Sequence, residues 1–127
     1  MITEDYVSFE TAKLLKEKGF DEKCHMCWDE VTKTMESADE YATNSELLAT
    51  YISAPTLQMA MKWLREVHGL FIGTVFQPEC LFKEDKWFWK WNISDKGHKL
   101  TLVEFGESDT YEEACESAIK YCLENLV

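Results

Sequence analysis

The sequence is poor in glycine, in basic residues and in long hydrophobic runs, and each shortage excludes a class of protein. Its five glycines are scattered along 127 residues, so no glycine-rich loop that binds nucleotide phosphates can be built. Thirteen lysines and arginines stand against 24 aspartates and glutamates, which gives a net charge of −11. This negative charge disfavours direct binding to nucleic acid and to anionic membrane surfaces. No run approaches the roughly eighteen apolar residues of a membrane span.

The cysteines and the first residues bear on the compartment. Five cysteines make an odd number, and the start Met1-Ile2-Thr3 lacks the basic and then apolar pattern of a signal peptide. We therefore expect a cytoplasmic protein with reduced thiols. Hydrophobic residues make up 46% of the chain and aromatic residues 13%. This is enough for one core, and we expect residues 1–127 to form a single domain.

Three helices are predicted from capping signals and from the spacing of apolar residues. The first follows Ser8, a residue type that often caps helix N-termini. The second begins near Ser53-Ala54-Pro55, because proline is tolerated in a first turn, and ends at Gly69. The third opens with Thr110-Tyr111-Glu112-Glu113, which matches a capping box.

Three strands are predicted between the second and third helices. They run from Phe71 to Gln77, from Lys86 to Ile93 and from Lys99 to Phe105. The connections are short, and Asp95-Lys96-Gly97 is typical of a hairpin turn, so we expect an antiparallel meander. The predicted fold is therefore α+β, with three helices packed on one face of a mainly antiparallel sheet.

The region from Asp21 to Ile52 gives weaker signals. Cys24 to Trp28 is predicted as a short strand, and Leu48 to Ile52 as a segment that could pair with it. The acidic stretch between them is interpreted as a turn or loop with a short helix.

The alternating residues Trp87, Trp89 and Trp91 are the most informative pattern in the chain. In a strand the three indoles share one face, whereas a helix would scatter them around its axis. Such a face can be core covered by the helices, a contact surface for another subunit, or a platform on which a flat ligand stacks. We keep it as the candidate interaction surface.

Cys24-His25-Met26-Cys27 is the strongest chemical motif. Two thiolates at this spacing can bind zinc or form a redox disulfide. A structural zinc site needs four ligands, however, and no second pair follows. Cys24 and Cys27 are therefore weak candidates for a metal site against ordinary core packing, and no cofactor is predicted.

No catalytic residues are predicted. The carboxylate pairs, such as Asp29 with Glu30 and Glu112 with Glu113, are adjacent in sequence and do not share a face. Acid–base catalysis needs a positioned pair in a cleft, so a solvated surface is the simpler interpretation. We expect a protein that is not an enzyme.

Three segments carry a resemblance to known sequences. They are Val7 to Phe20, Ala54 to His68 with the exception of residues 59–61, and Thr110 to Ala114. These segments resemble a group of small uncharacterised proteins from gut-bacterial prophages and mobile elements. The resemblance does not cover residues 21–45 and supplies no catalytic or binding residues. It implies a small cytosolic accessory protein.

The leading functional hypothesis is a non-enzymatic accessory protein that acts by contact with a protein partner or as a homodimer. The alternative is a small-ligand or metal binder that uses the aromatic strand face or the pair Cys24 and Cys27. Neither a membrane nor nucleic acid is expected as a partner.

Overall fold

The structure is a computed structural model that describes residues 1–78, 87–96 and 101–127, together with all their side chains except those of Asp39, Gln77, Pro78, Trp87 and Thr101. In chain order, the elements are α1 (Phe9–Glu17), β1 (Cys24–Asp29), β2 (Met35–Ala42), β3 (Tyr51–Ser53), α2 (Leu57–His68), β4 (Leu70–Pro78), β5 (Trp87–Asp95), β6 (Thr101–Ser108) and α3 (Tyr111–Asn125).

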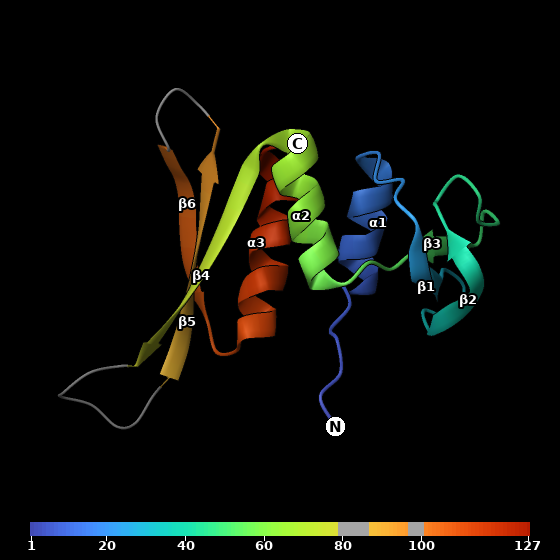
Figure 1. Ribbon diagram of the computed structural model, residues 1–127, viewed down its shortest axis with the longest axis horizontal. Coiled ribbons are helices and arrows are strands. Elements are labelled where there is room, and N and C mark those ends of the chain that lie inside the picture. Colours follow the sequence, from blue (N-terminus) through green and yellow to red (C-terminus); the bar gives the residue numbers. More distant parts are fainter. Residues whose placement is uncertain (79–86, 97–100) are drawn as a thin grey trace.

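These elements form the predicted α+β fold. The strands make two antiparallel sheets, a larger one in the order β4-β5-β6 and a smaller one in the order β2-β1-β3. All helices lie on the same side of the larger sheet (Figure 1). α2 and α3 contact this sheet, while α1 packs on α3 and against β3. The helices therefore separate the two sheets, and the other face of the larger sheet points outward.

The three helices begin at side-chain caps. The Oγ of Ser8 accepts a hydrogen bond from Thr11 N–H at the start of α1, and Thr110 plays the same part for α3. α2 begins later than predicted, because Thr56 rather than Ser53 supplies the capping oxygen. Ser53 ends β3 and is fully buried. Gly69 ends α2 with φ of 64°, a conformation that glycine adopts without strain.

The larger sheet follows the predicted meander in order and direction. β4 and β5 pair from Leu70 with Asp95 to Pro78 with Trp87, and β5 continues onto β6 with a register shift at Ile93. The predicted hairpin turn at Asp95-Lys96-Gly97 extends into residues 97–100, which lie outside the described residues. The connection between β4 and β5, residues 79–86, lies outside them as well.

The middle of the acidic stretch after β1 is a strand, β2 (Met35–Ala42), where the sequence predicted a turn or loop with a short helix, and turns lie on both sides of it. β2 runs antiparallel to β1 and pairs with it on one side only. An edge strand that is largely exposed has no regular alternation of apolar and polar residues, and the register shift between Cys24 and Met26 disturbs the pattern further. Its strand character was therefore hidden in the sequence.

The core is one cluster that runs from the larger sheet through the helices to the smaller sheet, where Cys24 and Ile52 belong to it. α3 contributes a continuous buried face, and α2 adds Leu57, Ala60, Met61, Trp63 and Leu64. Ile93 and Trp91 of β5 close the core from the sheet side. The helices thus bury one face of β4-β5-β6 and leave the other available for contact.

Candidate functional site

The predicted aromatic face points into the protein. Trp91 is only 8% exposed, and the centroid of its indole ring lies 6.2 Å from that of the Tyr121 ring of α3. Trp89 is half-buried between Phe76 and Tyr111, with ring centroids 5.2 Å away in both cases. The side chain of Trp87 lies outside the described residues. Of the three interpretations of this face, core packing is the one that fits the positions of Trp89 and Trp91.

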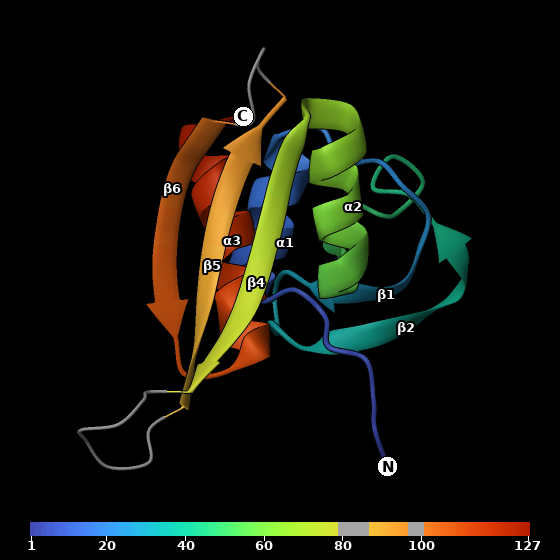
Figure 2. The same ribbon diagram turned by 60° about the vertical axis from the view of Figure 1, so that its left-hand side comes forward.

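The opposite face of the same sheet is a more accessible candidate, and we call it the outer face. Residues paired across an antiparallel sheet share a face, so the register assigns to it Phe71, Gly73 and Val75 from β4, Phe88, Lys90, Asn92 and Ser94 from β5, and Leu102, Phe105 and Glu107 from β6. Figure 2 shows this side of the sheet in front of α3 and α1, with α2 beside β4 and no labelled element over the face. No helix or strand of the described residues therefore blocks a partner from this face.

The outer face exposes several large apolar side chains. Phe105 is 69% exposed, Leu102 56% and Val75 52%. Single exposed apolar residues are ordinary on a protein surface, but several on one sheet face mark a site of contact. Phe71 and Phe88 are half-buried on the same face. Together these side chains form a sheet surface with substantial apolar area.

The outer face is close to neutral, although the protein is strongly acidic. Among the described residues on this face, the charged ones are Lys90 and Glu107, which are directly paired across β5 and β6. The ammonium of Lys90 also lies 5.8 Å from the centre of the Phe88 ring, a distance at which a cation is attracted to the ring. The face therefore combines apolar side chains with one charge of each sign.

The candidate pair Cys24 and Cys27 does not form a common site. Cys24 belongs to the main core, and its Sγ lies 3.9 Å from Sδ of the exposed Met59. Cys27 Sγ contacts the Glu36 carbonyl 3.6 Å away, on the other side of the smaller sheet. Burial raises the pKa of the Cys24 thiol to about 11 and also raises the pKa of Cys27. Both thiols stay protonated at neutral pH, whereas zinc binding and nucleophilic attack require the thiolate.

Within the described part of the chain, no three His, Cys, Asp or Glu side chains are placed so that they could hold a metal ion.

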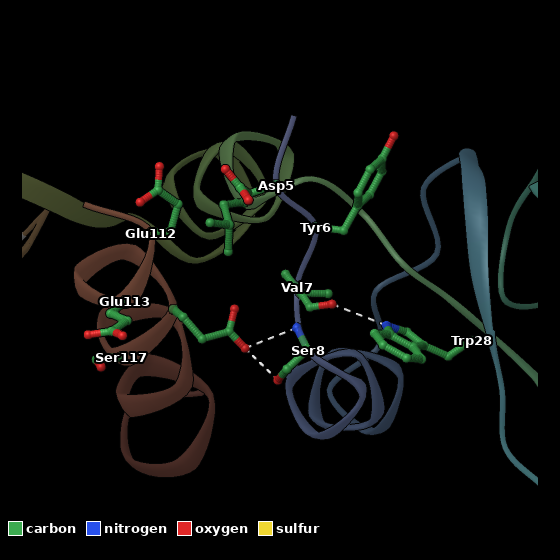
Figure 3. Close-up of a pocket in the computed structure, with 10 residues that line it drawn as sticks. Asp5, Tyr6, Val7, Ser8, Trp28, Glu112, Glu113 and Ser117 are labelled. Carbon is green, nitrogen blue, oxygen red and sulfur yellow. Dashed lines mark hydrogen bonds between the residues drawn. The ribbon is translucent and has the colours of Figure 1, made fainter. Parts of the chain in front are cut away.

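A pocket of about 320 Å³ lies between the segment before α1, β1 and the start of α3. Figure 3 shows Asp5, Glu112 and Glu113 at this pocket, with the Trp28 indole N–H donating to the Val7 carbonyl. The Glu116 carboxylate is engaged at the N-terminus of α1. Its Oε1 accepts hydrogen bonds from Ser8 N at 3.1 Å, Ser8 Oγ at 2.5 Å and Thr11 Oγ1 at 2.6 Å. This carboxylate ties α3 to α1, and its hydrogen bonds identify it as a structural group.

Sequence reasoning identified the outer face only in part. The alternation that puts the indoles on one face of β5 leaves Phe88, Lys90 and Asn92 on the other, but it does not combine them with Val75 and Phe105. The alternation Phe71, Gly73, Val75 was a usable signal for one row of this face. Leu102 and Phe105 are three residues apart, so simple alternation puts them on opposite faces. The register shift after Ile93 brings them to the same face.

Within the ranges 1–78, 87–96 and 101–127, none of the helices combines the length and the apolar character required to cross a membrane.

Comparisons with protein-family models, with curated proteins and with solved structures find no match to this chain.

Proposed function

We propose that this chain is a small cytoplasmic accessory protein that is not an enzyme and acts by protein–protein contact. The observation that carries the proposal is the outer face, where Val75, Leu102 and Phe105 are each more than half exposed on one sheet surface. Burial of exposed apolar area is the main driving force of protein association. The resemblance to small prophage and mobile-element proteins supports the accessory role.

The partner that best suits the outer face is a second copy of the chain. In a two-fold dimer the same surface occurs on both sides of the interface, so it must be self-complementary. Apolar side chains meet their equivalents without conflict, and the face supplies both Lys90 and Glu107 for contacts between copies. A face with one charge of each sign avoids the repulsion that the rest of this acidic protein would cause.

Light scattering coupled to size-exclusion chromatography tests this proposal over a range of protein concentrations. The average mass of the wild type should rise from that of one chain toward that of two. The double variant Leu102→Ser with Phe105→Ser should remain monomeric at the same concentrations, because it removes the two most exposed apolar side chains of the outer face.

A matched control places the same kind of change elsewhere on the surface. Val31 and Val67 are 78% and 58% exposed and lie outside the larger sheet. Val31→Ser with Val67→Ser should associate like the wild type. A wild type that stays monomeric at every concentration would overturn the assignment of a second copy, and so would a Leu102→Ser with Phe105→Ser variant that associates normally.

The alternative function, a small-ligand or metal binder, has no comparable observation in its favour. Its candidate residues Cys24 and Cys27 lie on different sides of the smaller sheet, and Trp91 is buried against α3.

A further inference from the structure

A second surface lies on the smaller sheet, on the side that faces away from the helices. It is a groove of about 550 Å³ between β2 and the segment that leads into β3. Its walls are mainly apolar, formed by Cys27, Ala38, Ala42, Leu47, Leu48 and Tyr51. Leu48 is 73% exposed at the edge of the groove. A concave apolar surface of this size is typical of binding sites.

Three carboxylates accompany the apolar walls of this groove, those of Glu36, Glu40 and Glu46. All three residues are exposed. Glu46 is fixed by Thr43, whose Oγ1 lies 3.1 Å from its Oε1. Glu36 and Asp29 raise the pKa of the Tyr51 hydroxyl by their negative charge. The raised pKa of Tyr51 therefore reflects the negative potential that an incoming ligand would meet in the groove.

We infer that this groove binds a segment of another protein in which arginine or lysine alternates with apolar residues. The basic side chains would meet Glu36, Glu40 and Glu46, while the apolar ones would contact Leu47, Leu48 and Tyr51. Charge complementarity selects this occupant over a second copy of the chain, because each copy carries −11 and would bring negative charge to a negative groove. The inference rests on the proposed function, contact with other proteins, but uses a different surface.

Fluorescence anisotropy with a labelled synthetic peptide of alternating arginine and leucine tests the inference. The wild type should bind this peptide more tightly than a peptide of alternating arginine and serine, which lacks the apolar contacts. The triple variant Glu36→Gln, Glu40→Gln, Glu46→Gln should bind the arginine–leucine peptide about tenfold more weakly, because it removes three exposed charge pairs of modest strength each. Leu48→Ser should weaken binding by a smaller factor.

The control variant Glu4→Gln, Glu17→Gln, Glu66→Gln makes the same change in net charge at exposed residues outside the groove. It should change the affinity by less than about twofold, since distant exposed charges are screened. An equal loss of peptide affinity in both triple variants would show that the peptide responds only to the net charge of the protein, and it would overturn the inference. Absence of binding by the wild type, or equal binding of both peptides, would also overturn it.

The outer-face variant Leu102→Ser with Phe105→Ser separates the two proposals. It should bind the peptide like the wild type, because neither residue lines the groove. If the groove inference is wrong and the proposed function is right, the peptide assay fails while the wild type still dimerises. If the dimer assignment is wrong, the mass measurements fail and the peptide assay still reports on the groove.

Discussion

Gly106 determines how the Trp91 indole packs on the inner face of the larger sheet. The two residues are directly paired across β5 and β6. A Cβ built on Gly106 would overlap the six-membered ring of the Trp91 indole, whereas the glycine lets this ring lie against the backbone. Trp91 is buried against α3, so the indole has little room to move away. One absent methyl group therefore fixes part of the contact between the sheet and the helices.

Gly106→Ala should lower the free energy of unfolding by about 1–3 kcal/mol, the usual cost of forcing extra volume into a packed core. Gly73→Ala is the matched control. Its Cβ would meet the Asn92 amide on the outer face, 2.8 Å from Oδ1, and this side chain can rotate toward solvent. Urea denaturation should show a smaller loss for Gly73→Ala. Equal losses would show that the Trp91 contact is not the cause.

Burial holds the thiols of the core in their protonated form. Burial raises the pKa of Cys122 from its ordinary value of 9.0 to about 12. In the unfolded chain the thiol ionises near its ordinary pKa, while in the folded protein it keeps its proton. Above that pKa the unfolded state therefore binds fewer protons than the folded state, and folding stability falls as the pH rises. Below it, both states carry the proton and Cys122 adds no pH dependence.

Stability should therefore decrease between about pH 9 and about pH 10.5, with Cys122 contributing on the order of 2 kcal/mol. Urea denaturation across this range measures the decrease. Cys122→Ala removes the thiol, so its stability should be lower at neutral pH but should fall less steeply with pH. Parallel slopes for the variant and the wild type would contradict the role given to Cys122.

At the scale of elements, the carboxylate of Glu116 joins the middle of α3 to the start of α1. It accepts hydrogen bonds from both the backbone and the hydroxyl of Ser8, the residue that caps α1. A carboxylate near a helix N-terminus also interacts favourably with the helix dipole. The N-terminus of α1 is thus stabilised by its own cap and by a group from a helix more than a hundred residues later in the sequence.

A double-mutant cycle measures this connection. Ser8→Ala should cost about 0.5–2 kcal/mol, as expected for the loss of an N-cap, and Glu116→Ala should also destabilise. The double variant should lose less stability than the sum of the two single losses, with a coupling of about 0.5–3 kcal/mol, because the two residues share one interaction. Thr56→Ala combined with Glu116→Ala is the control, since Thr56 caps α2 instead. That pair should be additive, and an equally large coupling there would contradict the proposed connection.

The sequence predicted the elements whose signals are local. Ser8, Gly69 and Thr110 mark helix ends through interactions with neighbouring residues, and the structure has helix ends at all three. The alternating indoles predicted β5 for the same reason. The start of α2 was predicted near Ser53, Ala54 and Pro55, whereas Thr56 caps this helix in the structure. Tertiary pairing of Ser53 with Cys27 decides against the earliest of them.

The two candidate surfaces could not be predicted from local sequence signals, because each depends on how distant strands pair. The outer face is defined by three strands, and its membership changes with a register shift after Ile93 that no local signal reveals. The groove on the smaller sheet required β2, an edge strand without apolar alternation. In the sequence, its carboxylates Glu36, Glu40 and Glu46 look like part of a solvated acidic stretch. Only the fold places them beside Leu47 and Tyr51.

At the scale of the whole molecule, the helices lie between two sheets that expose different surfaces (Figure 1). The larger sheet presents a nearly neutral apolar face, and the smaller sheet presents a groove with carboxylates. Net charge acts on the two surfaces in opposite directions. It opposes association of two copies, each with a charge of −11, but it favours the approach of a basic segment.

Salt should therefore separate the two interactions. Raising the salt concentration from about 50 mM to about 500 mM shortens the screening length from about 14 Å to about 4 Å. Self-association through the outer face should become stronger, because screening reduces the repulsion between two acidic molecules while the apolar contacts persist. Binding of the arginine–leucine peptide should become weaker over the same range, because its attraction to the groove is screened. Light scattering and anisotropy at matched salt concentrations measure both effects. Weaker self-association at high salt would mean that charged contacts dominate the dimer, and would contradict an apolar interface on the outer face.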